Sequence, residues 1–253
     1  QFDELEREVM LHLTAEFLGG EESVTNDLLP LIQTVAGEGR LEEEMYLTSF
    51  LFEEAKHVES FRRFLDEVAD EHTDLSRFHG ENYQMIFGDK LPTALNALRD
   101  DPSPQNQAIA SVTYNMIVEG VLAETGYYAF HSMLEEQDLL PGMREIAGLL
   151  KQDESRHLAF GVYFLSRLTA EHGDDVWNTI EGRMNEMLPL AIGMINETFE
   201  QYEELPFGLE LDTFVEYATQ QFQKRYARIA KARTETVEDL NDDEDSFNGV
   251  AAE

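Results

Sequence analysis

Two short stretches, Glu54-Ala55-Lys56-His57 and Glu154-Ser155-Arg156-His157, share the pattern Glu-x-x-His and decide the fold of this chain. Each stretch lies inside a long segment in which apolar residues recur every three or four positions, as they do in amphipathic helices. Residues three apart lie on one face of an α-helix, so each carboxylate points the same way as its imidazole. One such pair is common on a solvated helix face, whereas two copies in two long helices predict a shared metal site.

A further Glu precedes each stretch in a segment that also reads as helix. Glu21 lies 33 residues before the first stretch, and Glu119 lies 35 residues before the second, among apolar neighbours. A carboxylate is costly to bury there unless it is paired or bound to metal. Glu22 is an alternative to Glu21, although the one-turn spacing to Val24 favours Glu21.

One Glu from each of two helices, with Glu-x-x-His from two others, is typical of ferritin-like di-iron and di-manganese bundles. The sequence therefore predicts an all-α protein with a ferritin-like four-helix bundle core and additional helices. The alternative for these residues is a set of surface Glu and core His side chains with no metal.

Helical periodicity extends over most of the chain, and strand-type alternation is hard to find. Bends are expected at Gly19-Gly20, Pro30 and Pro189. From residue 234 the composition changes, because eight of the last twenty residues are acidic and none is cationic. We therefore predict one dimetal domain over residues 1–233 and an acidic, flexible tail over 234–253. Helices are predicted over residues 2–36, 41–69, 92–99, 105–136, 143–171, 176–204 and 211–232.

The charge balance limits the partners. The 253 residues include 52 Asp or Glu against 18 Lys or Arg, a net charge of −34. So acidic a surface repels phosphate groups, which excludes nucleic acids and anionic membranes as first interpretations. The absence of Cys excludes disulfides, thiolate metal ligands and a Cys nucleophile. No apolar run is long enough for a transmembrane helix.

The same balance bears on the environment of the protein. Only 5 of the 18 cations are Lys, and many acids with few Lys suit concentrated salt, where like-charge repulsion is screened. We interpret the chain as a cytoplasmic protein of a halophile, since its first ten residues are also too charged for a secretory signal. The alternative is an ordinary acidic protein.

The four Glu and two His side chains also indicate the metal. Four carboxylates carry a charge of −4, which two divalent cations balance when both imidazoles are neutral. Oxygen-rich ligation with one His per ion suits iron or manganese better than zinc. Ligand type does not choose between iron and manganese, because manganese is the weakest binder of the usual divalent metals.

Four segments resemble the ligand-binding oxidases related to the ribonucleotide reductase small subunit, and the likeness covers most of the chain from about Leu5 to Arg167. These segments are Glu21-Glu22-Ser23-Val24, Leu41-Glu42-Glu43-Glu44-Met45-Tyr46, Phe52-Glu53-Glu54-Ala55-Lys56-His57 and Asp153-Glu154-Ser155-Arg156-His157. The resemblance implies a site with one manganese and one iron ion, with two iron ions as an alternative. It also implies that Asp153 accepts a hydrogen bond from a ligand His. The implied metal ligands are Glu21, Glu54, His57, Glu119, Glu154 and His157.

The resemblance further implies an activity, a ligand and a homodimer. Proteins of this family activate dioxygen, form an ether bond between a Val and a Tyr beside the metals, and bind a long-chain fatty acid through its carboxylate. Here the Val falls on Val24 and the Tyr on Tyr114. Tyr114 lies five residues before Glu119, about 140° around an ideal helix, so its assignment depends on the resemblance alone. A different long-chain carboxylate is an alternative ligand.

Three other functions are weighed against this one. A ribonucleotide reductase small subunit would share the ligands, but the radical Tyr of many such subunits falls here on Phe61, and residues 234–253 contain no Tyr for radical transfer. A manganese–iron subclass of those subunits also has Phe at that position. A ferroxidase or iron-storage protein would not be expected to have the helices after about Val176. A non-enzymatic helical bundle would leave the duplicated motif unexplained.

Overall fold

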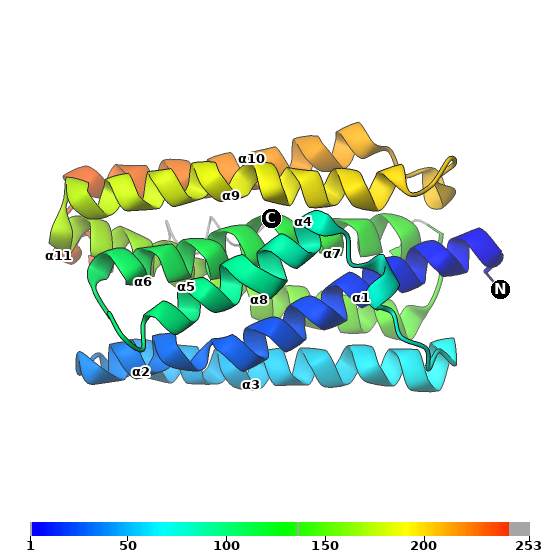
Figure 1. Ribbon diagram of the computed structural model, residues 1–253, viewed down its shortest axis with the longest axis horizontal. Helices are drawn as coiled ribbons and strands as arrows, with labels where there is room; N and C mark the ends of the chain where they lie inside the picture. The colour runs from blue at the N-terminus through cyan, green and yellow to red at the C-terminus, as the bar shows by residue number, and fades with distance from the viewer. Residues whose placement is uncertain (1, 136, 243–253) are drawn as a thin grey trace.

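The computed structural model describes residues 2–135 and 137–242, and within these residues the chain forms helices and connecting turns with no strand. The long helices lie roughly side by side along the longest axis of the molecule (Figure 1). The predicted all-α class with a ferritin-like core is confirmed. The α-helices of the first half are α1 (Glu4–Asp27), α2 (Leu29–Gly37), α3 (Leu41–Arg63), α4 (Glu81–Tyr83), α5 (Leu91–Ala97) and α6 (Pro104–Ser111). Those of the second half are α7 (Glu124–Phe130), α8 (Pro141–His172), α9 (Asp174–Glu200), α10 (Leu211–Lys231) and α11 (Val237–Asp242).

Several segments that continue these helices are wound as π-helix, in which each backbone N–H bonds to the carbonyl five residues back. The longest joins α6 to α7 and covers Val112–Ala123, so that α6, this π-helical segment and α7 form one continuous rod. Shorter π-helical segments are Phe64–Ala69 after α3, Gln84–Lys90 before α5, and His131–Glu135 after α7.

The core bundle consists of α1, α3, α8 and the rod that contains Val112–Ala123. α1 packs along α3, α8 packs along the rod, and α9 and α10 both cover the rod from outside (Figure 1). The two extra helices therefore complete the burial of the rod, whose residues Val112 to Leu122 are all buried. Burial on every side of the rod is what allows a polar site to be held away from water.

The observed boundaries differ from the predicted ones at the first bend. α1 runs through Gly19-Gly20, and the break comes at Leu28, because Pro30 stands in the first turn of α2, where its missing N–H costs nothing. A capping box between Asp3 and Glu6 fixes the start of α1. α9 continues through Pro189.

The first part of the acidic tail is ordered as α11, which packs against α8 and buries Leu240. Residues 243–253 lie outside the described residues, so the division into a domain and a flexible tail stays a prediction. Across residues 2–135 and 137–242, no helix combines the length and the apolar character needed to cross a membrane.

Candidate metal centre

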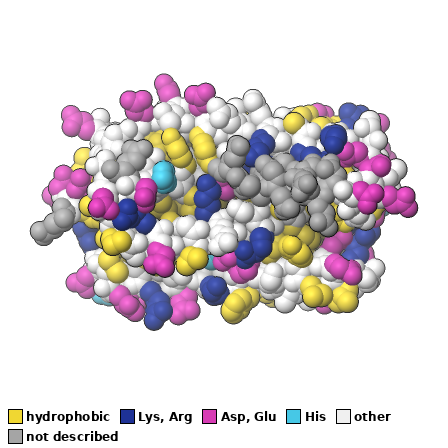
Figure 2. Space-filling view, turned by 180° about the vertical axis from the view of Figure 1, so that it is seen from behind, with side chains coloured by type: hydrophobic (Ala, Val, Ile, Leu, Met, Phe, Trp, Pro, Cys, Tyr) yellow, Lys and Arg dark blue, Asp and Glu magenta, His cyan; other side chains and the backbone are white. Residues whose placement is uncertain are grey.

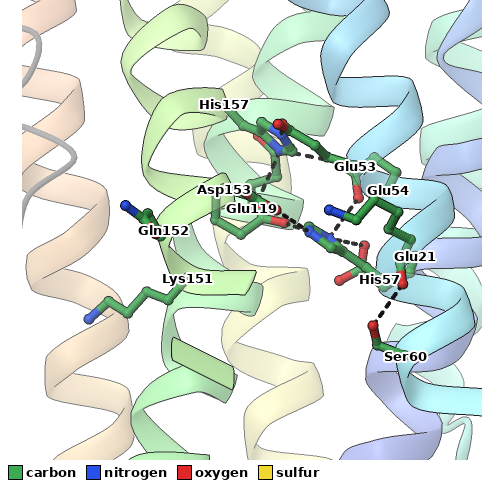
Figure 3. A network of polar contacts seen from close by, with 12 residues as sticks. Glu21, Glu53, Glu54, His57, Ser60, Glu119, Lys151, Gln152, Asp153 and His157 are labelled. Atoms are coloured by element: carbon green, nitrogen blue, oxygen red, sulfur yellow. Dashed lines mark hydrogen bonds and ion pairs between the residues drawn. The ribbon is translucent and has the colours of Figure 1, made fainter. Parts of the chain in front are cut away.

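The six predicted ligands come from four different helices and meet inside the bundle (Figure 3). All six side chains are buried, and none is more than 7 % exposed. Glu21 comes from α1, Glu54 and His57 from α3, Glu119 from the π-helical segment, and Glu154 and His157 from α8. Glu22, the alternative to Glu21, instead points outward to Arg62.

These side chains form two overlapping groups, each with four ligand atoms within 4.8 Å of one another. Glu54 and Glu154 belong to both groups, whereas each His belongs to only one. An arrangement of two shared carboxylates between two His ligands fits two adjacent cations, each with one imidazole and several oxygens. The first group is Glu21, Glu54, His57 and Glu154; the second is Glu54, Glu119, Glu154 and His157.

Unpartnered atoms inside the cluster agree with this arrangement. His57 Nδ1 and Glu154 Oε2 are buried and have no hydrogen-bond partner among the described residues. His57 Nδ1 lies 3.4 Å from both Glu21 Oε2 and Glu154 Oε1. Leaving such polar atoms unpaired is costly in a dry interior, and a cation between them would satisfy them. The donor set therefore fits a pair of divalent ions.

Burial and the neighbouring charges favour the protonated forms of several groups in the metal-free cluster. Burial, with the nearby charge of Glu154, raises the pKa of Glu119 to about 8. Burial and the charge of Glu54 likewise raise the pKa of Glu21. Burial alone would lower the pKa of His57, but the carboxylates of Glu21 and Glu154 outweigh it and raise that pKa. Protons thus supply positive charge that bound cations would replace.

A carboxylate from the opposite motif holds the outer nitrogen of each His. Asp153 Oδ2 lies 3.4 Å from His57 Nε2, as predicted for Asp153, and Glu53 Oε2 lies 2.9 Å from His157 Nε2. The hydrogen bond from His157 lowers the pKa of Glu53. Arg156 Nη2 donates to Glu53 and to Asp153 at 2.6 Å each, so one guanidinium joins the two carboxylates. These contacts fix both imidazoles with Nδ1 facing the cluster.

Replacement of Glu53 by Gln is expected to weaken metal binding about 10- to 100-fold, because the amide is a poorer acceptor for the imidazole N–H. Asp153→Asn should do the same at the other ion. Competition with a chelator, followed by metal analysis, measures the effect. Glu59→Gln, an exposed change on the same helix, is the matched control, and equal affinities for Glu53→Gln and the control would contradict this role.

Tyr114 reaches the cluster, although ideal helical spacing places it away from Glu119. Its hydroxyl donates to Glu54 Oε1 at 2.8 Å, and the side chain is fully buried. The reason is the π-helical winding of Val112–Ala123. With hydrogen bonds five residues apart, Tyr114 and Glu119 come onto nearly the same face.

An apolar cavity begins at the cluster and includes Val24 in its wall. The carboxylates Glu21, Glu54, Glu119 and Glu154 line one end of it. The cavity holds about 760 Å³ of space free of atoms, part of it open to solvent. Away from the cluster, its lining comes from α1, the segment Gln84–Lys90, the rod, α9 and α10 and is apolar apart from three side chains. Val24 thus lines the same cavity as the four carboxylates.

Some residues that shape the site were missed from sequence. Glu53 could have been found, because it precedes the first Glu-x-x-His as Asp153 precedes the second. Asn115 donates to Glu119 Oε2 at 2.9 Å and orients that carboxylate; Gly161 on α8 leaves room for it, since a Cβ there would lie 2.3 Å from Asn115 Cβ. Arg225 on α10 donates to the carbonyl of Gly120 at 2.8 Å, a contact without any sequence signal.

Comparison with known proteins agrees with this site. The family model described as "Ribonucleotide reductase, small chain" matches residues 1–226. The chain belongs to the ribonucleotide reductase small-chain family. Within that family, several similar solved structures are R2-like ligand-binding oxidases, and the resemblance inferred from sequence is confirmed.

Three solved structures illustrate the similarity. An R2-like ligand-binding oxidase from Sulfolobus acidocaldarius is 37 % identical, with a TM-score of 0.86 over 94 % of this chain and 82 % of that one. A valine-to-isoleucine variant of such an oxidase with an anaerobically reconstituted Mn/Fe cofactor is also 37 % identical, with a TM-score of 0.86 over 92 % of this chain and 83 % of that one. A third, with an aerobically reconstituted metal cofactor after photoconversion, is 36 % identical, with a TM-score of 0.87 over 92 % of this chain and 84 % of that one.

Proposed function

We propose that this protein is a dioxygen-activating oxidase that holds one manganese and one iron ion on Glu21, Glu54, His57, Glu119, Glu154 and His157. The observation that carries the proposal is that Glu54 and Glu154 belong to both ligand groups. The Mn/Fe cofactor named for the similar solved structures supports the choice of metals. Glu53, Asp153 and Arg156 would keep both imidazoles oriented while the ions bind.

The first substrate of the oxidation would be the protein itself, at Val24 and Tyr114. An ether bond between Val24 Cβ and Tyr114 Oη forms when the Cβ–H and O–H bonds break, which removes two hydrogens and two electrons. Dioxygen is the oxidant and is reduced to water, which takes four electrons. Formation of the ether bond supplies two of them, and the metal pair, when bound, would supply the other two. The hydrogen bond from Tyr114 to Glu54 gives the phenolic proton an acceptor.

The cavity suits a long-chain fatty acid or a similar carboxylate. Its apolar walls would take the chain. Because the cluster carboxylates are part of its lining, the ligand carboxylate could reach the cations. The negative charge of the ligand carboxylate would then help to balance the positive charge of the cations. Chain burial against these walls would supply most of the binding free energy.

A ribonucleotide reductase small subunit is the second candidate, and the match to that family model favours it. Phe61 argues against it, because it stands where many such subunits have their radical Tyr. Its ring is buried and stacked on Phe17 and Phe130, with no hydroxyl to oxidise. An oxidase that acts on Val24 and Tyr114 does not need a Tyr at that position.

Dioxygen uptake tests the proposed activity. Protein loaded anaerobically with Mn(II) and Fe(II) should consume dioxygen when air is admitted, and metal-free protein should consume none. An oxygen electrode makes the measurement. If the loaded protein takes up no more dioxygen than the metal-free protein, the proposal fails.

We also propose that the protein is a homodimer that pairs through α3. Leu41, Met45 and Phe52 lie on one face of this helix, and each is more than half exposed. Apolar side chains on one exposed face often mark an interface between subunits. A Phe52→Glu variant should run as a monomer in light-scattering chromatography while the wild type runs as a dimer. Gln220→Glu on α10 adds the same charge elsewhere as a control, and a dimeric Phe52→Glu protein would contradict the assignment.

The acidic surface supports the proposal of a halophilic, cytoplasmic protein. Asp and Glu side chains are spread widely over the face in Figure 2, in line with the net charge of −34. Screening by salt should relieve their repulsion. The melting temperature should therefore rise steadily with potassium chloride up to molar concentrations, and a flat response would favour an ordinary acidic protein.

A further inference from the structure

One more carboxylate lines the cavity besides the four of the metal cluster, that of Glu16. Three polar side chains line the cavity besides the ligands: Glu16 on α1, Thr125 on α7 and Thr198 on α9. Thr125 donates its hydroxyl to the carbonyl of Val121 within its own helical rod, so it is already satisfied. The hydroxyl of Thr198 lies within hydrogen-bond distance of both the carbonyl of Met194, at 3.0 Å, and Glu16 Oε1.

The hydrogen bonds of Glu16 are incomplete. Thr198 Oγ1 donates to Glu16 Oε1 at 2.8 Å, and His12 Nε2 lies 3.4 Å from the same oxygen. In the part of the chain that the structure describes, no hydrogen bond reaches Glu16 Oε2. The side chain is 10 % exposed, and Oε2 is not one of the fully buried atoms that lack a partner. This oxygen therefore has no donor from the protein and is open to one from a ligand in the cavity.

His12 lies next to the Glu16 carboxylate and is itself held in place. The imidazole is buried, stacks on Phe78 and bonds through Nδ1 to the hydroxyl of Tyr202 at 2.9 Å. Its Nε2 has no hydrogen-bond partner among the described residues. Tyr202, His12, Glu16 and Thr198 therefore form one group of neighbouring polar side chains, of which Glu16 and Thr198 line the cavity.

Glu16 is within reach of a ligand bound at the metals. It lies five residues before Glu21 on α1, which corresponds to about 7.5 Å along the helix axis. A chain that starts at the cluster and runs along α1 would pass Glu16, which lines the same cavity. A purely aliphatic chain would leave Oε2 buried without a donor, which costs binding free energy.

We propose that the natural ligand is a hydroxylated long-chain carboxylate, whose hydroxyl donates to Glu16 while its carboxylate faces the metals. This inference depends on the proposed function for the carboxylate end and adds a selectivity for the chain. A site with an unpaired acceptor selects against the analogue that lacks the donor. The site also selects against a ligand with a second carboxylate at that depth, because its negative charge would face that of Glu16.

Calorimetric titration of the metal-loaded protein tests the proposal. Octanoate, decanoate and dodecanoate would be compared with their ω-hydroxy forms and with the matching dicarboxylates. For the chain whose end reaches Glu16, the ω-hydroxy acid should bind about tenfold tighter than the parent acid, and the dicarboxylate should bind weakest. In a Glu16→Leu variant the parent acid should instead bind tighter than its ω-hydroxy form, whereas Glu8→Leu, a more exposed change on the same helix, should preserve the wild-type order.

Each outcome bears on a separate claim. Parent acids that bind as tightly as every ω-hydroxy acid in the wild type would overturn this inference and leave the proposed function standing. A preference that persists in a folded Glu16→Leu variant would overturn the role of Glu16. If no acid binds, the proposed carboxylate ligand and this inference both fail, while the proposed oxidation is tested separately by dioxygen uptake. The wild-type series decides the matter even if Glu16→Leu does not fold.

Discussion

A Glu154→Ala variant is expected to retain neither metal ion after reconstitution. Glu154 belongs to both ligand groups, so its removal takes an oxygen from each cation and leaves the other carboxylates to repel one another. Glu21→Ala should behave differently, because Glu21 belongs to the His57 group alone. That variant should lose one ion and keep the other.

Metal analysis after desalting separates these outcomes. The wild type should hold two ions per chain, Glu21→Ala one, and Glu154→Ala close to none, while Glu59→Ala provides an exposed control on α3. Circular dichroism would establish that each variant keeps its helices. Two ions in folded Glu154→Ala protein would contradict a shared carboxylate at this position.

An Arg167→Met variant should lose about 3–5 kcal/mol of unfolding free energy, because it leaves a buried carboxylate without its partner. Arg167 is buried on α8, and its Nη2 donates to Glu43 on α3 at 3.0 Å. Its Nη1 also donates to Glu171 at 2.7 Å. Burial raises the pKa of Glu43, and Arg167 and Arg40 oppose that rise. Arg40 lies farther away, 3.8 Å from Glu43, and would not replace Arg167.

Urea unfolding of the metal-free protein measures this loss. A Glu43→Leu/Arg167→Met double variant should recover much of it, since an apolar pair of similar volume carries no unpaired charge. Arg63→Met, which removes only exposed ion pairs to Glu59 and Glu67, should cost less than about 1 kcal/mol. An Arg167→Met variant as stable as Arg63→Met would contradict the importance of the buried pair.

The clustering of the six candidate ligands could be predicted from sequence because it depends on local spacing. Glu-x-x-His puts two ligands on one helix face whatever the rest of the fold does, and Glu119 stood out by its apolar neighbours. The choice of Glu21 over Glu22 also followed from spacing, and the structure buries the first and pairs the second with Arg62. The helix boundary at Gly173 was predicted to within two residues, whereas the helices run through Gly19-Gly20 and Pro189, where bends were expected.

Tyr114 could not be placed from spacing because the helix that carries it is not an α-helix. Sequence does not reveal that Val112–Ala123 is wound with hydrogen bonds five residues apart, and the change in winding rotates Tyr114 onto the ligand face. Contacts between segments that are far apart in the sequence could not be predicted either. Arg225 reaches Gly120 across 105 positions of sequence, and only the packing of α10 on the rod brings them together.

The most direct test of the central claim is a tryptic peptide mass map of protein loaded with manganese and iron, before and after exposure to air. Cleavage releases residues 8–40, which hold Val24, and residues 100–144, which hold Tyr114. We expect these peptides to be joined after air, with a mass two hydrogens below their sum, and to stay separate in a Tyr114→Phe variant. Separate peptides in aerated wild-type protein that holds both metals would contradict the proposed oxidation of Val24 and Tyr114.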